Sequence, residues 1–270
     1  MLVVTKMGGK VLRGNLPQIA DDIKAFVSKA ENKIVLVHGG GIEVTAIAQK
    51  FGVPPKFVVS PEGFRSRYTD KETIEIYNMV MSGKINKHVV STLQSRGIQS
   101  VGLSGADGSL LKAKRKSRIV IVDERNRKKV IDGGFTGKVE EVNTQLLITL
   151  INSGYVPVIA PVAISENYEL LNVDGDRAAA QVAGALKADK FILLTDVEGV
   201  LLNGKPIQKI NVSEAKETLP KIGAGMITKV YAAVEALNLG AKEAIIVSGL
   251  IKTPISSAIN HESGTVITNE

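Results

Sequence analysis

Three consecutive glycines follow a short apolar run in the segment VLVHGGGIEV, residues 35–44. A related pattern occurs near the N-terminus, where TKMGGK places Lys6 two residues before Gly8 and Gly9. Glycine is costly at such positions because it loses more conformational entropy on folding than any other residue. Glycines repeated after predicted strands therefore indicate that something approaches the backbone closely there.

Most of the other predicted strands also end in glycine together with a small or charged polar residue. Three such ends are SG at 104–105, TDVEG at 195–199 and SG at 248–249. The carboxyl ends of parallel strands meet at one edge of a sheet, where ligands of α/β proteins bind. Backbone amides freed by glycine near helix N-termini favour an anion, so the pattern predicts a phosphate or carboxylate site at this edge.

Two common nucleotide motifs are absent from the sequence. No segment has the form GxxxxGK[ST], and GGGIEV does not fit GxGxxG with an acidic residue at a second strand end. A dehydrogenase with a dinucleotide-binding fold therefore remains only a second alternative.

Two further segments carry charged residues near predicted helix starts. LNVDGDRAAA, residues 171–180, places Asn172, Asp174 and Asp176 before an alanine-rich helix, and Asp176 could simply be its N-cap. GAGMITKV, residues 223–230, places Lys229 in the first turns of another helix, where a solvated lysine is the alternative.

Alternating strand and helix patterns predict a mostly parallel sheet covered by helices on both faces. Predicted strands begin at residues 2, 33, 98, 155, 190, 243 and 264, and predicted helices at 16, 43, 70, 144, 177 and 226. The third of these is either one long helix or two helices broken at Gly83. Alternation around a charged turn predicts a β-hairpin over residues 118–131 that stands off the main sheet.

The composition narrows the class of protein. The 270 residues are 44% hydrophobic and include no cysteine, which excludes disulfides, thiolate metal sites and a cysteine nucleophile. No apolar run approaches the ~18 residues of a membrane span, and the N-terminus lacks a signal-peptide pattern, so we expect a soluble cytoplasmic protein without membrane partners. The net charge of +7 favours an anionic partner, while the 4% aromatic content disfavours a nucleic-acid-binding module.

The ordered set TKMGGK, VHGGG, GFRSRYTD, NVDGDRAAA, LLTDVEGV and GAGMITKV resembles the amino acid kinase family, and acetylglutamate kinases in particular, over essentially the whole chain. The resemblance implies an α/β amino acid kinase fold, an open mostly parallel sheet sandwiched by helices, with an added β-hairpin in the N-terminal lobe. It implies an N-terminal lobe over 1–170 for acceptor binding and dimerisation, and a C-terminal lobe over 171–270 for ATP binding. A homodimer is expected.

The resemblance also implies a reaction, in which ATP phosphorylates a side-chain carboxylate to give an acyl phosphate. The implied catalytic residues are Lys6, Lys229 and Asp176, with Asp176 holding both lysines. The implied acceptor-binding residues are Gly40, Gly41, Arg65, which forks onto a carboxylate, and Asn172. The implied nucleotide-binding residues are Gly8, Gly9, Thr195, Asp196, Gly199, Gly225 and Met226. Mg²⁺ is expected to arrive bound mainly to ATP, with no metal site built from protein ligands.

GFRSRYTDKET and MSGKINK resemble one branch of the family more narrowly, which phosphorylates aminoadipate or glutamate attached to a small acidic amino-group carrier protein. Basic segments LKAKRKSR (111–118) and RNRKK (125–129) flank the predicted hairpin and could dock such a carrier. The alternative for the basic segments is a solvated hairpin with charged edges. The alternatives for the protein are a kinase of free acetylglutamate and a nucleic-acid-binding module that uses the same basic segments. One methylene changes binding by only ~1–3 kcal/mol, so aminoadipate and glutamate are not separated. Because the first predicted strand begins at about Leu2, we expect no inhibition by arginine through an N-terminal helix.

Overall fold

The computed structural model describes residues 1–61, 63–202, 204–218 and 222–269. Its centre is an eight-stranded sheet in the order β16-β18-β17-β13-β1-β2-β10-β5. These strands are β16 (Lys209–Asn211), β18 (Thr265–Thr268), β17 (Ala244–Ser248), β13 (Lys190–Thr195), β1 (Leu2–Met7), β2 (Lys33–His38), β10 (Val156–Ala160) and β5 (Ser100–Ser104). All neighbouring pairs are parallel except β17 with β18, which confirms the predicted mostly parallel sheet.

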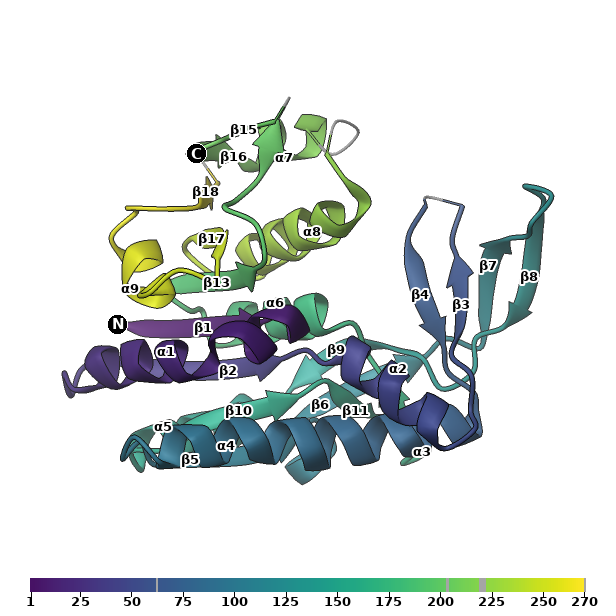
Figure 1. Ribbon diagram of the computed structural model, residues 1–270, viewed down its shortest axis with the longest axis horizontal. Coiled ribbons are helices and arrows are strands. Elements are labelled where there is room, and N and C mark those ends of the chain that lie inside the picture. The colour runs from purple at the N-terminus through teal and green to yellow at the C-terminus, as the bar shows by residue number, and fades with distance from the viewer. Residues whose placement is uncertain (62, 203, 219–221, 270) are drawn as a thin grey trace.

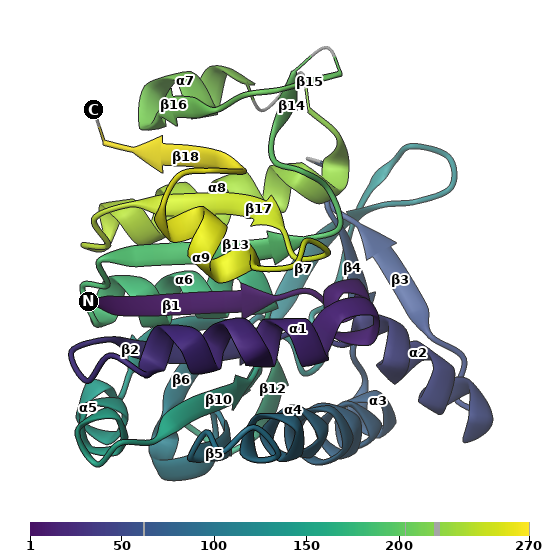
Figure 2. The same cartoon turned by 60° about the vertical axis from the view of Figure 1, so that its left-hand side comes forward.

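Helices cover both faces of this sheet, as Figure 2 shows for the face that carries α1. Adjacent strand residues alternate between the two faces, so Val3 packs on one side with α1, α4 and α9 while Val4 packs on the other with α5, α6 and α8. The covering helices are α1 (Gly9–Val27), α4 (Asn86–Gln94), α9 (Pro254–Ile259), α5 (Thr144–Asn152), α6 (Gly175–Ala185) and α8 (Ala224–Asn238). Burial on both faces explains why the strands read as continuous apolar runs.

Helix α1 begins earlier than the sequence pattern predicts, at Gly9 rather than Leu16. Asn15 leaves the helical conformation, and its side-chain amide donates to the carbonyls of Gly249 and Ile251, both at 2.7 Å. Pro17 follows directly and lacks the N–H that a continuous helix would use. The kink lets α1 start at the glycines that follow β1.

The third predicted helix contains an irregular turn but is not broken at Gly83. It consists of α3 (Lys71–Asn78), a π-helical segment η1 (Met79–Ile85) and α4. Helix α2 (Gly41–Lys50) packs beside it, around a small core that includes Val44 and Met81. The π segment shifts the helix register where these helices meet.

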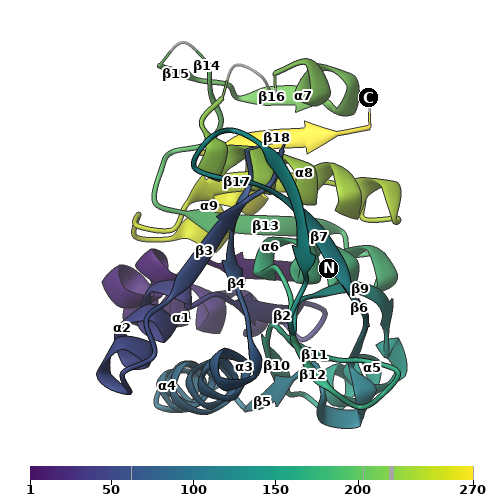
Figure 3. The same cartoon turned by 90° about the vertical axis from the view of Figure 1, so that its right-hand side faces the viewer.

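Two hairpins project from the body of the molecule at one end (Figure 1). One pairs β7 (Arg118–Val122) with β8 (Lys128–Asp132), which confirms the predicted hairpin. The other pairs β3 (Lys56–Val59) with β4 (Arg65–Tyr68) and was not predicted. Strands β3 and β7 contact each other, so the hairpins lie side by side, as Figure 3 also shows from the hairpin end.

The remaining elements are smaller. A four-stranded sheet contains β12 (Leu170–Asn172), β11 (Val162–Ile164), β6 (Leu111–Arg115) and β9 (Gly137–Val142). The others are the turn η2 (Asp107–Ser109), the pair β14 (Leu201–Leu202) and β15 (Lys205–Pro206), and helix α7 (Val212–Thr218). No helix in the described ranges has both the length and the apolar character needed to cross a membrane. The division into lobes at residue 170 stays a prediction.

Candidate active site

The carboxyl ends of the central strands meet at one edge of the sheet. Met7 of β1 is in register with His38 of β2, and Leu194 of β13 aligns with Met7 on the other side. The glycines of both N-terminal motifs therefore emerge next to each other and next to Thr195, although they are far apart in sequence.

A cavity of about 1580 Å³ opens at this edge. That is more than the ~300–1,000 Å³ of a pocket for one small ligand, so two substrates can meet in it. Eleven of the fourteen residues expected at the site line it: Lys6, Gly8, Gly9, Gly40, Gly41, Arg65, Asn172, Asp176, Thr195, Asp196 and Lys229.

At the base of the cavity, one carboxylate is shared by two lysines. Lys6 Nζ lies 2.6 Å from Asp176 Oδ1, and Lys229 Nζ donates to Asp176 Oδ2 at 3.0 Å. The side chains of Lys6 and Asp176 are only 10% and 7% exposed, so water screens this cluster little. Burial alone would raise the pKa of Asp176, but the charges and hydrogen bonds of Lys6 and Lys229 outweigh it and lower the pKa to about 2. The cluster thus carries one net positive charge.

The N-cap of α6 is Asp174 and not Asp176. Asp174 Oδ1 accepts a hydrogen bond from the Arg177 amide at 2.9 Å, whereas Asp176 lies in the first turn of the helix. The alternative that Asp176 is only a cap is therefore wrong. Because Asp174 satisfies the helix end, Asp176 is left to bind the two lysines.

The glycine loops expose backbone donors to the cavity. Gly8 and Gly40 are the N-cap residues of α1 and α2, and neither helix has a side-chain cap. A Cβ at Gly40 would lie 2.1 Å from Ile85 Cδ1 and 2.8 Å from Met81 Sδ, so these two η1 side chains would have to move to admit it. A Cβ at Gly41 would meet nothing within 4 Å, because that position faces open space. Free amides at two adjacent helix N-termini suit an anion.

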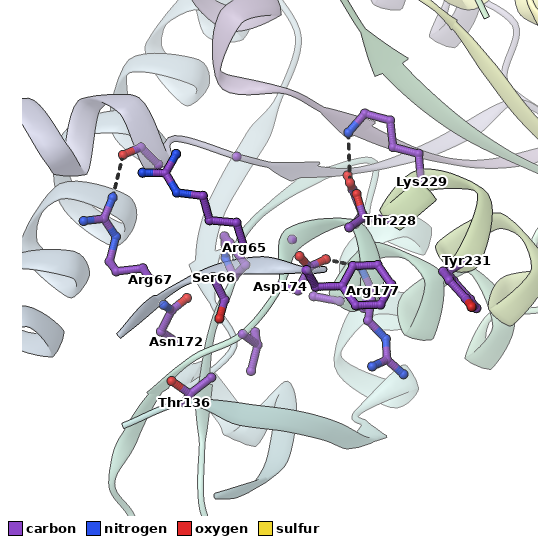
Figure 4. A pocket seen from close by; sticks show the side chains of 18 of the residues that line it. Arg65, Ser66, Arg67, Thr136, Asn172, Asp174, Arg177, Thr228, Lys229 and Tyr231 are labelled. Atoms are coloured by element: carbon purple, nitrogen blue, oxygen red, sulfur yellow. Dashed lines mark hydrogen bonds and ion pairs between the residues drawn. The ribbon is translucent and has the colours of Figure 1, made fainter. Parts of the chain in front are cut away.

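Two arginines of β4 enter the cavity from the same side, since residues two apart share a strand face (Figure 4). Arg65 is exposed and its guanidinium lies 4.0 Å from the centre of the Phe57 ring. Arg67 is half-buried, and its Nη2 donates to Gly41 O at 2.9 Å and to Thr45 Oγ1 at 2.7 Å. Its buried Nη1 meets no acceptor in the described residues. Sequence analysis missed Arg67, although the RSR spacing placed it beside Arg65.

Asn172 lines the cavity opposite α8, and its side-chain amide donates to Thr69 Oγ1 at 2.9 Å. Asp196 lies beside Thr195 and pairs with Lys10 at 2.6 Å. Lys229 and Tyr231 approach the cavity from α8, on the side opposite Arg67 (Figure 4). One wall is therefore rich in cations and amides from the N-terminal half, and the other is formed by α6 and α8.

Residues 1–248 match the amino acid kinase family. The chain belongs to this family. A protein of Cenarchaeum symbiosum is 51% identical to it over 266 residues, covering 98% of this chain and 99% of that protein. The "[LysW]-aminoadipate/[LysW]-glutamate kinase" of Sulfolobus acidocaldarius is 48% identical over 267 residues, covering 98% of this chain and all of the relative.

A solved structure of N-acetylglutamate synthase from Neisseria gonorrhoeae, complexed with coenzyme A and N-acetyl-glutamate, has the same fold as this amino acid kinase. The TM-score is 0.82 at 23% sequence identity, and the match covers all of this chain and 59% of that one. At this identity the likeness extends to the fold alone. The expected amino acid kinase fold is confirmed.

Three expected nucleotide residues of this kinase do not line the cavity: Gly199, Gly225 and Met226. A Cβ at Gly199 would lie 2.7 Å from Thr265 Oγ1, so close packing against β18 accounts for that glycine. Gly225 and Met226 lie in the first turn of α8, and Met226 packs against the core. Their nucleotide role stays a prediction.

The basic residues of this kinase near 111–129 do not form one uniform patch. Arg115 pairs with Glu169 at 2.6 Å and covers the Phe135 ring, and Lys112 pairs with Glu141 at 3.1 Å. Lys116 lines the cavity, close to Arg177. Charge reversal at Lys116 would therefore also disturb the substrate cavity. Exposed basic residues outside the cavity lie on hairpin β7–β8, at Arg118, Arg125, Arg127, Lys128 and Lys129, and on β6, at Lys112 and Lys114.

Proposed function

We propose that this kinase transfers the γ-phosphoryl group of ATP to the side-chain carboxylate of aminoadipate or glutamate whose amino group is linked to an acidic carrier protein. The observation that carries the proposal is the shared carboxylate of Asp176 between Lys6 and Lys229, beside two glycine loops in one cavity. The names of curated relatives that align over nearly the whole chain support the acceptor.

In the reaction, a carboxylate oxygen of the acceptor attacks the γ-phosphorus while the bond to the bridging oxygen of ADP breaks. No proton is transferred, so the protein acts by positioning and electrostatics. Lys6 neutralises charge on the side of the acceptor, and Lys229 neutralises charge on the leaving phosphates. Asp176 holds both ammonium groups at fixed positions, and amides of Gly9, Gly40 and Gly41 bind the transferring group between them. The Gly8 amide donates to Leu194 O at 3.2 Å and so fixes the loop rather than the phosphoryl group.

The α-carboxylate of the acceptor amino acid, which does not react, is bound by the arginines of β4. Arg65 is the residue expected from sequence, and its stacking on Phe57 leaves its donors accessible. Arg67 lies beside the glycine loop, because its Nη2 donates to Gly41 O, and its buried Nη1 has no acceptor among the described residues. We assign both to the acceptor, with Arg67 closer to the reacting end and Asn172 on the same side of the cavity as Arg67 (Figure 4).

Mg²⁺ accompanies the nucleotide and neutralises its phosphates when bound. Within the described residues no group of three or more His, Cys, Asp or Glu side chains is arranged to hold a metal ion. Asp176 and Asp196 line the cavity but are paired with lysines. The ion would therefore be held by phosphate oxygens and water, as Mg²⁺ often is.

The carrier is proposed to dock on hairpin β7–β8, where exposed positive charges stand beside the cavity. Ile121 and Val120 of β7 line the cavity, so a carrier bound to this hairpin could extend its attached amino acid toward Arg67. We further propose a cytoplasmic homodimer, with acceptor binding in residues 1–170 and ATP binding in residues 171–270.

The deciding experiment is a kinase assay in which hydroxylamine traps the acyl phosphate. Acetylglutamate, acetylaminoadipate and both carrier-linked substrates are compared side by side with Mg-ATP. We expect much higher kcat/KM with at least one carrier-linked substrate. Preference for free acetylglutamate would instead identify an acetylglutamate kinase, and absence of ATP-dependent product with all four would reject the proposal.

A further inference from the structure

Two buried polar side chains beside the glycine loop have no role in the chemistry described above. His38, at the end of β2, and Asn86, at the start of α4, are both fully buried. Burying such groups is costly unless hydrogen bonds satisfy them. Their hydrogen-bond partners therefore indicate what they do.

Segment η1 brings Asn86 to His38. In a π-helical turn the backbone bond joins residues five apart, so Met81 and Asn86 both face inward. Both ends of the Asn86 amide are defined by their neighbours. Lys87 Nζ, which can only donate, contacts Asn86 Oδ1 at 2.9 Å, whereas Asn86 Nδ2 donates to the carbonyl of Val158 at 2.9 Å.

The orientation of Asn86 decides the protonation of His38. Asn86 Nδ2 lies 3.3 Å from His38 Nε2 and equally 3.3 Å from Leu103 O. Because an amide nitrogen cannot accept, a proton on Nε2 would face a donor, so the proton of the neutral ring resides on Nδ1. His38 Nδ1 is 3.1 Å from Gly39 O, a carbonyl that only accepts. Burial lowers the pKa of His38 to about 4 despite this hydrogen bond, and the charges of Lys6 and Lys87 lower it further. The ring is therefore a neutral donor at physiological pH.

The hydrogen bond to Gly39 O controls the direction of the next amide. A trans peptide is planar, so the N–H of Gly40 points opposite to the Gly39 carbonyl that faces the buried ring. The neighbouring groups are already bound: the Gly39 amide donates to Met7 O at 2.8 Å and Gly40 O accepts from the Val44 amide at 3.0 Å. In the described part of the chain, the Gly40 N–H meets no protein acceptor, and Gly40 lines the cavity.

We propose that His38, held by Asn86, is a positioning residue that fixes the Gly39–Gly40 peptide so that the Gly40 N–H faces the transferring phosphoryl group. The inference rests on the proposed function, because it assigns the anion to phosphoryl transfer. A donor whose direction is set before reaction stabilises developing charge without reorganisation.

The first test is nuclear magnetic resonance of the ¹⁵N-labelled protein, which requires no activity. The chain has three histidines, and His88 and His261 are exposed. We expect His38 to show the Nδ1–H neutral tautomer unchanged from pH 8 to pH 5.5. A protonated Nε2 in the resting protein would overturn the proposal, whatever the substrate proves to be.

The second test compares three variants by kcat and by affinity for ADP and for ADP–aluminium fluoride with acceptor. His38→Leu should lower kcat roughly 100-fold, the effect of losing one oriented donor, and should weaken ADP–aluminium fluoride far more than ADP. His38→Asn, which keeps a donor near the position of Nδ1, should restore most of kcat. Asp22→Ala removes a buried cap of α9 outside the cavity and should cost stability but not kcat.

Equal losses of ADP and ADP–aluminium fluoride affinity in His38→Leu would show a merely structural role and overturn the proposal. So would a His38→Asn variant as slow as His38→Leu. If His38→Leu fails to fold, the tautomer measurement and His38→Asn still decide the question.

Discussion

Phe64 and Tyr231 join the two sides of the cavity. Their rings meet edge to face, with centroids 5.7 Å apart and planes inclined by 69°. Phe64 belongs to the loop of hairpin β3–β4, and Tyr231 lies on α8 two residues after Lys229. The hairpin that carries Arg65 and Arg67 is thereby tied to the helix that carries Lys229, the proposed catalytic lysine.

Removing this contact should weaken acceptor binding. We expect Tyr231→Ala to raise the acceptor KM roughly 2- to 10-fold, since an aromatic pair contributes about 0.5–1.5 kcal/mol. Tyr231→Phe keeps the ring and is the matched control. Steady-state kinetics at saturating ATP measures the effect, and an unchanged KM in Tyr231→Ala would show that the contact does not position the hairpin.

The two lysines around Asp176 should be essential to turnover but not to folding. Lys6→Ala or Lys229→Ala should lower kcat roughly 100-fold or more, because each removes a charge that stabilises the transition state. Lys242→Ala is the control, since Lys242 forms an exposed ion pair with Asp189. Near-normal kcat in either well-folded cavity variant would refute the assignment.

Arg65 and Arg67 can be separated by conservative substitution. Lysine cannot form the guanidinium fork, so either substitution should raise the acceptor KM and spare the KM for ATP. Arg67→Lys should have the larger effect, roughly 10-fold or more, because a charge-assisted hydrogen bond contributes about 1.5–3 kcal/mol. A larger rise of the acceptor KM in Arg65→Lys would show that Arg65 is the main ligand of the acceptor carboxylate. An unchanged KM in both variants would show that neither arginine binds the acceptor.

Stability should fall as the pH drops below 6.5. The pKa of His38 is about 4 in the folded protein, against 6.5 for an ordinary histidine, so the unfolded chain binds a proton that the folded protein resists. Between pH 6.5 and pH 4 the loss should be on the order of 3 kcal/mol. The lowered pKa of Asp176 adds a further loss only between about 3.8 and about 2. Urea unfolding from pH 7.5 to pH 4 measures the slope, and an unchanged free energy of unfolding across this range would contradict the prediction.

Docking through hairpin β7–β8 predicts a salt effect limited to the carrier-linked substrate. Lys128→Glu/Lys129→Glu should raise the KM for that substrate at low salt, and the difference should shrink as screening shortens the range of attraction below the ~8 Å of physiological salt. Lys29→Glu/Lys252→Glu changes the same charge at exposed sites outside the cavity. One contrary result is an equal rise of the KM in the two double variants, and another is an equal rise for free and carrier-linked acceptors. Each of these results would show that hairpin β7–β8 is a solvated hairpin and not a docking surface.

The sequence alone determined the local features of this kinase. Apolar runs such as KIVLVH specify buried strands because both faces of the sheet are covered, and glycines after them mark the edge where ligands bind. Hairpin β7–β8 was predictable because its strands adjoin a charged turn. Strands β3 and β4 were missed because the strand pattern of four-residue segments is weak.

Only the tertiary structure decided which side chains meet. Lys6 and Asp176 are 170 residues apart, and Asp176 and Lys229 are 53 apart, so no local pattern distinguishes a shared carboxylate from an N-cap. The same holds for His38 and Asn86, whose contact depends on a π turn in η1 and on the packing of α4 against the sheet. Residue types and local periodicity determine the elements, whereas the geometry of the site depends on long-range packing.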